Sequence, residues 1–156
     1  MSTGSSNTEQ NRVSGGETLG TQPANSADAI VFFDGVCGLC NHSVNWLLVR
    51  DTHRKLRFAP LQGSTAAFCV PRNLRDQLST LVFQSNGKTF IRSGAVARIL
   101  MTLGGMWWLA GFLLWLIPFP LRDLGYRIVS RLRYQLFGKH DACRLPTPAE
   151  RSVFLD

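Results

Sequence analysis

The chain has 156 residues, a formal net charge of +7 and 45% hydrophobic residues, which predicts one globular domain with a basic surface. Such a surface suits nucleic acid, anionic lipid or an acidic partner. The sequence shows no RNP, zinc-finger or helix-turn-helix motif. We therefore expect no nucleic-acid partner and interpret most of the arginines as solvated surface residues.

The first 28 residues differ in composition from the rest of the chain. They are rich in Ser, Thr, Gly, Asn and Gln and hold few large apolar residues. A segment of this kind buries too little apolar surface to offset the entropy lost on ordering. We therefore predict a disordered tail over 1–28 and a folded domain over 29–156. The tail lacks the apolar core of a secretory signal, so we expect a cytoplasmic location.

The folded domain begins with a predicted strand, helix and strand. The run AIVFFD (29–34) is aromatic and β-branched, which is typical of a buried strand. From Cys37 the apolar period becomes helical, and basic residues suggest that this helix ends between Arg50 and His53. Apolar and basic residues alternate in KLRFAPL (55–61), which predicts a second strand. A strand–helix–strand unit predicts that the two strands are parallel.

A short helix and a hairpin are predicted next. The stretch 64–70 suits a helix that Ser64 caps and Pro71 stops. The stretch 79–95 is the clearest hairpin in the chain, because Asn86–Gly87 is a type I′ turn signal between two apolar runs.

Another helix is predicted to follow the hairpin directly. Ser93 is a suitable N-cap, and Gly104–Gly105 is a suitable end. The apolar residues of this helix fall on one face: Val96, Ile99, Leu100 and Leu103.

The segment 106–117, MWWLAGFLLWLI, has twelve residues without a charge. A membrane span needs roughly twenty apolar residues, so a span is the least favoured interpretation. We expect a buried helix that packs against the sheet or against a dimer partner. The alternative is a segment that lies on a membrane surface.

The segment 121–138 predicts an amphipathic basic helix that ends at Gly138. Arg122, Arg127 and Arg133 fall on the face opposite to the apolar stripe. The stripe itself consists of Leu121, Leu124, Ile128, Val129, Leu132 and Leu136. Most helices of this kind are surface helices of a globular domain. Peripheral contact with a membrane is the alternative function of this helix.

The order of these elements predicts an α/β fold of the thioredoxin-like class. We expect a central mixed sheet of about four strands, because a parallel pair is followed by an antiparallel hairpin. Helices should flank this sheet, and 106–138 should form a C-terminal helical extension.

The C-x-x-C pair lies where the first strand gives way to a helix. A thiolate is the nucleophile in disulfide exchange. The free amides and the dipole at a helix N-terminus stabilise an anion there. We therefore assign Cys37 as the attacking thiol and Cys40, one turn later, as the resolving thiol.

Asp34 precedes Cys37 by three residues and has two interpretations. It could serve as a general acid and base for the thiol pair. It could also be a turn residue, because Asp-Gly after a strand commonly forms an Asx-turn or caps the next helix. An anionic Asp34 would raise a nearby thiol pKa, so it suits proton transfer better than thiolate stabilisation.

The stretch FDGVCGLCNHSVNWLLVRD, followed by RFAPLQG, resembles the DCC family of thioredoxin-like thiol-disulfide oxidoreductases. The family takes its name from an Asp–Cys–Cys motif, matched here by Asp34, Cys37 and Cys40. Three later stretches, IRSGAVARIL, PLRDLGYRIVSRLRYQLFG and DACRLPTPAERSVFLD, resemble it as well, so the resemblance covers about 29–156. It implies a thioredoxin-like fold and a redox role with a thiol or disulfide substrate.

The chain departs from ordinary thioredoxins in two places. Thioredoxins carry a proline before the third strand, whereas the matching position here falls near Ser79–Thr80. Their Trp-Cys-Gly-Pro-Cys motif is also absent, because Val36 precedes the first cysteine and Leu39 the second. We therefore expect a narrower protein partner or a small-molecule thiol rather than general protein-disulfide reduction.

Two rival functions remain open. The first is a zinc site of Cys37 and Cys40 with His140 and Cys143, although a single C-x-x-C with an H-x-x-C is a weak zinc signal. The second is a non-catalytic module that binds a membrane surface or a partner. We expect no cofactor and no catalytic role for Cys69. Cys143 is not expected to be catalytic either, unless the fold brings it to the active pair.

Overall fold

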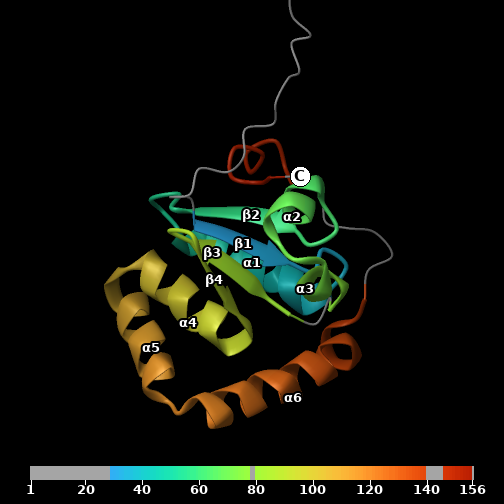
Figure 1. Cartoon of the computed structure of the whole chain (residues 1–156). Helices are drawn as coiled ribbons and strands as arrows, with labels where there is room; N and C mark the ends of the chain where they lie inside the picture. Colours follow the sequence, from blue (N-terminus) through green and yellow to red (C-terminus); the bar gives the residue numbers. More distant parts are fainter. Residues whose placement is uncertain (1–28, 78–79, 140–145, 156) are drawn as a thin grey trace, which may run out of the picture.

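The computed structural model describes residues 29–77, 80–139 and 146–155 (Figure 1). The predicted tail over 1–28 lies outside these residues, as do His140 and Cys143.

Four strands form one mixed sheet in the order β2-β1-β3-β4. They are β1 (Ala29–Phe33), β2 (Leu56–Pro60), β3 (Val82–Ser85) and β4 (Lys88–Ile91). β1 pairs in parallel with β2 and antiparallel with β3, which pairs antiparallel with β4. All five residues of β1 are buried, as an apolar central strand requires. The predicted thioredoxin-like α/β class is confirmed.

The predicted hairpin is also confirmed. Asn86 and Gly87 form its tip with φ angles of 50° and 71°. A type I′ turn needs positive φ at both central positions, and Asn-Gly is the pair that tolerates it best.

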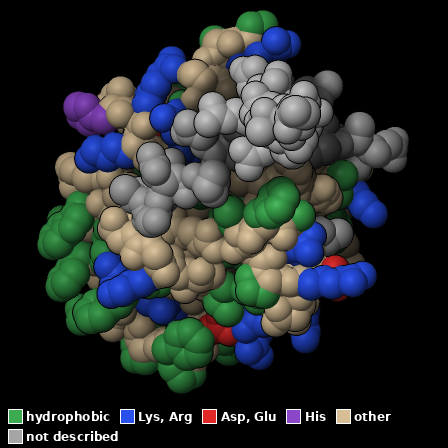
Figure 2. All heavy atoms as spheres, turned by 45° about the horizontal axis from the view of Figure 1, so that its top comes forward, with side chains coloured by type: hydrophobic (Ala, Val, Ile, Leu, Met, Phe, Trp, Pro, Cys, Tyr) green, Lys and Arg blue, Asp and Glu red, His purple; other side chains and the backbone are tan. Residues whose placement is uncertain are grey.

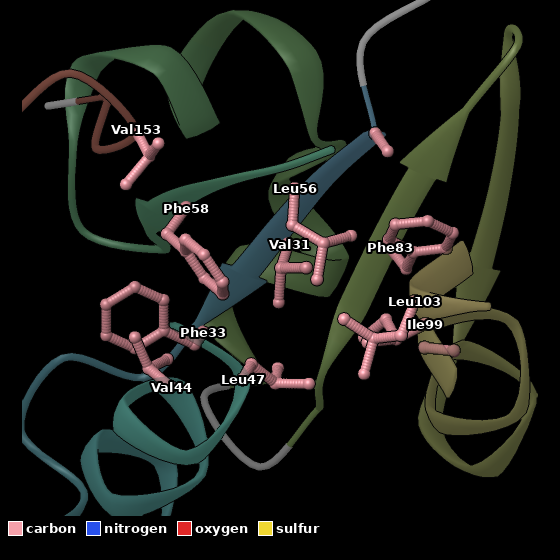
Figure 3. Close-up of a cluster of buried hydrophobic side chains, with 12 residues drawn as sticks. Val31, Phe33, Val44, Leu47, Leu56, Phe58, Phe83, Ile99, Leu103 and Val153 are labelled. Carbon is pink, nitrogen blue, oxygen red and sulfur yellow. The ribbon is translucent and has the colours of Figure 1, made fainter. Parts of the chain in front are cut away.

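Helices cover both faces of the sheet. α1 (Gly38–Arg50) and α4 (Arg92–Leu103) bury Val44, Leu47 and Ile99 on one face, against Val31 and Phe58 (Figure 3). On the other face, α2 (Ser64–Cys69) and the segment after it pack on Ile30 and Phe32. α3 (Arg72–Asp76) follows on this side and was not predicted, because Pro71 ends one helix and at once starts the next.

Both predicted serine caps are wrong. α2 starts after Gly63, and Ser64 is its first helical residue. α4 starts after Ile91, because Arg92, with φ of 52°, turns the chain from strand into helix within one residue. Ser93 is therefore inside the first turn, where its buried hydroxyl accepts a hydrogen bond from Arg122 Nε at 3.1 Å.

The helical extension consists of α5 (Gly105–Leu116) and α6 (Phe119–Phe137). α5 packs on α4 through Gly111, where a Cβ would lie 2.6 Å from the Ala97 carbonyl oxygen. Gly111 is the one buried residue of α5, so the prediction of a helix buried against the sheet is wrong. α4 already covers that part of the sheet, and α5 lies outside it (Figure 1).

Among the described residues, no single helix has both the length and the apolar character needed to cross a membrane. Taken together, α5 and α6 meet that criterion by length and composition, but the pair is bent by 108°.

The last described residues complete the sheet at its β2 edge. Phe58 donates its amide to the Val153 carbonyl at 2.8 Å and accepts from the Leu155 amide at 2.7 Å. The Phe154 ring contacts Phe58 and Phe33. This segment satisfies backbone groups that an exposed edge strand would leave open.

Candidate dithiol site

Cys37 is the N-cap of α1, as the sequence predicts. Its backbone is extended, with φ of −85° and ψ of 120°, and its sulfur accepts a hydrogen bond from the Cys40 amide at 3.3 Å. β1 ends at Phe33, and a short turn brings Cys37 from the end of this central strand to the helix. The sulfur therefore lies against one of the amides that a helix N-terminus leaves without a backbone partner.

An attacking thiol needs an accessible sulfur, but Cys37 is 0% exposed in this conformation. The chain leaving α6 lies over it. Lys139 forms a β-bridge with Cys37, and the Gly38 amide donates to the Gly138 carbonyl at 3.3 Å. This backbone runs so close that a Cβ on Gly38 would collide with the Phe137 carbonyl oxygen.

Cys40 is half-buried and lies one turn along α1. Its sulfur accepts a hydrogen bond from Arg133 Nη1 at 3.4 Å. Burial, the hydrogen bond with Cys37 and the charge on that residue together raise the pKa of the Cys40 thiol to about 12, although Arg133 lowers it. Both cysteines are free thiols in this structure, so the site is described in its reduced state.

Asp34 is 1% exposed and accepts four hydrogen bonds. Its Oδ1 accepts from the Val36 amide at 3.2 Å and from Gln62 Nε2 at 2.9 Å. Its Oδ2 accepts from Arg133 Nη2 at 3.2 Å and from the Tyr134 hydroxyl at 2.5 Å. The bond from the Val36 amide forms the Asx-turn that the turn-residue interpretation of Asp34 predicts. The charge on Asp34 also contributes to the raised pKa of Cys40. Its use as an acid or base stays a prediction.

Arg133 and Tyr134 were not predicted as site residues. Both come from α6, about one hundred residues after Asp34, and the Arg133 side chain is 5% exposed. Arg133 joins Cys40 to Asp34 through its two terminal nitrogens. Burial and the hydrogen bond to Asp34 raise the pKa of Tyr134 to about 12. A buried carboxylate needs a partner, but the sequence shows neither that Asp34 is buried nor which distant cation pairs with it.

A cavity of about 340 Å³ opens beside Cys40, between β1, α1, α4 and α6. Its walls are mostly apolar and include Phe33, Leu39, Leu81 and Val129, with Arg133 at the cysteine. The Cys40 side of the pair thus faces an apolar pocket, whereas the Cys37 side faces backbone.

The described residues contain no cluster of three or more His, Cys, Asp or Glu that could hold a metal. His140 and Cys143, two of the four ligands in the zinc hypothesis, lie outside the described residues. Cys69 is a free thiol at the end of α2, and its carbonyl accepts a hydrogen bond from Gln84 at 2.7 Å.

The chain is similar to a known protein family and to two known proteins. The family model of the DCC1-like thiol-disulfide oxidoreductases matches residues 31–139. The chain is 33% identical over 128 residues to "Uncharacterized protein YuxK" of Bacillus subtilis (strain 168), covering 81% of this chain and 93% of that protein. It is 35% identical over 118 residues to "DCC family protein At1g52590, chloroplastic" of Arabidopsis thaliana, covering 74% and 69%. No solved structure matches significantly.

Proposed function

This chain belongs to the DCC1-like thiol-disulfide oxidoreductase family, and from this membership and the site geometry we propose that it exchanges electrons with thiol or disulfide substrates through a reversible Cys37–Cys40 disulfide. The observation that carries the proposal is the hydrogen bond from the Cys40 amide to the Cys37 sulfur at the start of α1. It combines an anion-stabilising position with a second thiol one turn away.

The two thiols differ in their surroundings, and we assign their roles from this difference. Cys37 lies on the helix N-terminus and is the thiolate that attacks. Cys40 keeps its proton because burial raises its pKa to about 12. Cys40 is therefore a poor nucleophile until its proton is removed, which suits a resolving thiol.

The reductive direction proceeds in two exchanges. The Cys37 thiolate attacks a substrate disulfide, so a mixed disulfide forms at Cys37 and one substrate thiolate leaves. Cys40 then loses its proton and attacks the Cys37 sulfur, which releases the second substrate thiolate. The substrate gains two electrons, and the two cysteines lose them as their disulfide forms.

Asp34 and Arg133 serve the second exchange in this proposal. Asp34 receives the proton of Cys40, while Arg133 stabilises the transient Cys40 thiolate. The support is that one guanidinium donates to both the Cys40 sulfur and the Asp34 carboxylate. The protonated carboxyl can later return the proton to a leaving thiolate.

Substrate access sets two further requirements. The Gly138–Lys139 backbone covers Cys37, so it has to move away before the sulfur can attack. The apolar cavity beside Cys40 then favours a substrate that carries an apolar group next to its sulfur.

The test is to trap the mixed disulfide. Reduced native chain, Cys37→Ser, Cys40→Ser and a Cys69→Ser control are treated with a small aromatic disulfide and analysed by mass spectrometry. We expect an adduct on Cys37 in the Cys40→Ser chain, and a Cys37–Cys40 disulfide in the native and Cys69→Ser chains. An adduct that forms on Cys40 of the Cys37→Ser chain, but not on Cys37 of the Cys40→Ser chain, would reverse the assigned roles. Failure of the native chain to form the disulfide would reject the function.

A further inference from the structure

The outer surface of α5 and α6 is apolar over its whole length. Of the nineteen large apolar side chains that are exposed among the described residues, sixteen lie between Met106 and Phe137. They include Trp108, Leu113 and Leu121, each about half exposed or more. We call this set the α5–α6 face. The surface of a soluble protein rarely carries so many adjacent apolar side chains without a binding partner.

The orientation of α6 is fixed from its inner side. Arg122 donates to Ser93, the Tyr126 hydroxyl accepts from the Leu81 amide at 2.9 Å, and Arg133 and Tyr134 bind Asp34. These polar side chains hold one side of the helix against the sheet domain. The apolar stripe is consequently held outward, and rotating the helix to bury it would break these bonds.

The exposed charged side chains of α5 and α6 are all basic. Asp123 is the only acidic residue between Gln77 and Lys139. Its side chain is 5% exposed and pairs with Arg127 and Arg92. Arg131 is exposed on α6, and Lys139 is exposed just after this helix ends. Figure 2 shows hydrophobic side chains along the left and lower margin, where α5 and the start of α6 lie in Figure 1, with Lys and Arg side chains and a small patch of acidic atoms among them.

We propose that the α5–α6 face docks on the surface of an anionic lipid bilayer, with its apolar side chains in the interface and its arginines at the headgroups. A bent pair of helices with an apolar outer side and basic flanks has the properties of an interfacial segment. A spanning arrangement would pull α6 away from Asp34 and the sheet. A symmetric dimer through this face would set arginines against arginines without an exposed carboxylate on α5 or α6 to pair them.

The test uses the full chain and vesicles of phosphatidylcholine with or without an equal amount of phosphatidylglycerol. We expect co-sedimentation with the anionic vesicles, and binding at least about fivefold weaker for Arg131→Glu, because each cation near such a surface contributes to affinity. The double variant Leu113→Glu/Leu121→Glu should lose binding. Phe68→Glu, at an 89% exposed site on α2, is the matched control and should bind like the native chain.

The depth to which the α5–α6 face enters the bilayer is measured with lipids that carry bromine on their acyl chains. The bromine quenches the fluorescence of nearby tryptophans. Trp108 and Trp115 should be quenched, and the double variant Trp108→Phe/Trp115→Phe should lose the response. Trp46 and Trp107 pack on each other at 4.6 Å between ring centroids and are the internal reference.

The proposal fails if the native chain does not bind anionic vesicles, or if Leu113→Glu/Leu121→Glu binds as tightly as native. It also fails if light scattering shows a dimer that this double variant dissociates, because the face would then be a protein interface. Native-like urea unfolding of the double variant verifies its fold, and unchanged formation of the Cys37–Cys40 disulfide keeps this result separate from the redox function.

Discussion

The sheet domain and the α5–α6 extension orient their apolar side chains in opposite directions. In the sheet domain the apolar residues point inward, and Phe32, Phe58 and Val82 are fully buried. In α6 the apolar stripe points outward, and the buried residues are Asp123 and Arg133. The same amphipathic pattern thus produces a core in one region and a polar site in the other.

This difference shows how much an amphipathic pattern can predict. The period determines which residues share a face of a helix. It does not determine which face turns toward the protein, because that depends on what the neighbouring elements offer. At the start of α1 the sheet domain offers a buried carboxylate, Asp34, which needs a cation, and α6 supplies Arg133.

The largest loss of stability is expected for a substitution in the core of the sheet domain. Phe58→Ala removes a fully buried ring that contacts Phe154. We expect the free energy of unfolding to fall by about 4 kcal/mol, through lost burial and the cavity that remains. Urea unfolding of the full chain measures it. A loss below about 1 kcal/mol would show that this side of the sheet is not the core.

A slightly smaller effect is expected on the inner side of α6. Arg133→Leu leaves the Asp34 carboxylate buried without its cation, and the free energy of unfolding should fall by about 3 kcal/mol. The double variant Asp34→Asn/Arg133→Leu should be more stable than the sum of the two single changes predicts. The free energies of unfolding are measured in urea. If the losses of the two single variants add up to the loss of the double variant, Asp34 and Arg133 are not coupled.

The inner side of α6 also predicts a loss of stability in alkali. The folded chain holds the Cys40 proton up to about pH 12, whereas the unfolded thiol loses it near its ordinary value of 9.0. The raised folded pKa stabilises the fold fully below pH 9. This contribution declines by up to about 1.4 kcal/mol per pH unit as the pH rises toward 12. Between pH 8 and pH 10.5, the native chain should therefore lose more stability than Cys40→Ser; equal losses would contradict the raised pKa.

The smallest effect is expected on the outer side of α6. Leu121→Ala removes an apolar side chain that is 64% exposed. The free energy of unfolding in solution should change by less than about 0.5 kcal/mol, because the side chain is solvated before and after unfolding. If this variant unfolds as easily as Phe58→Ala, the stripe is buried in solution and the comparison between the two regions is wrong.

The sheet domain could be predicted largely from local patterns. β1, α1, β2 and the Asn86–Gly87 hairpin were predicted because each has its own periodicity or turn signal. α3 was missed because five residues are too few to show a period. The caps at Ser64 and Ser93 were wrong because Gly63 and Ile91, one and two residues earlier, are already the N-cap residues of these helices.

The candidate site could be predicted only in part. Asp34, Cys37 and Cys40 lie within one motif, and the structure places all three at the start of α1. Arg133 and Tyr134 complete the site from a distant helix, and nothing in their local sequence shows that they point inward. The cover over Cys37 is likewise a long-range contact, between Gly38 and Gly138.

The position of α6 also links the two proposals in space. Its inner side binds the dithiol site, and its outer side carries the α5–α6 face. The cavity beside Cys40 is lined by Val129, which belongs to that outer stripe. Val129 therefore belongs both to the cavity wall and to the α5–α6 face.

A redox titration of the native chain against glutathione tests the central claim most directly, with mass spectrometry reporting the Cys37–Cys40 disulfide. We predict a single reversible two-electron transition that Cys69→Ser keeps and Cys37→Ser abolishes. A midpoint near about −270 mV would indicate a reductant and one near about −120 mV an oxidant. If Cys37 and Cys40 remain two separate thiols at every glutathione ratio, the chain does not work as a dithiol oxidoreductase.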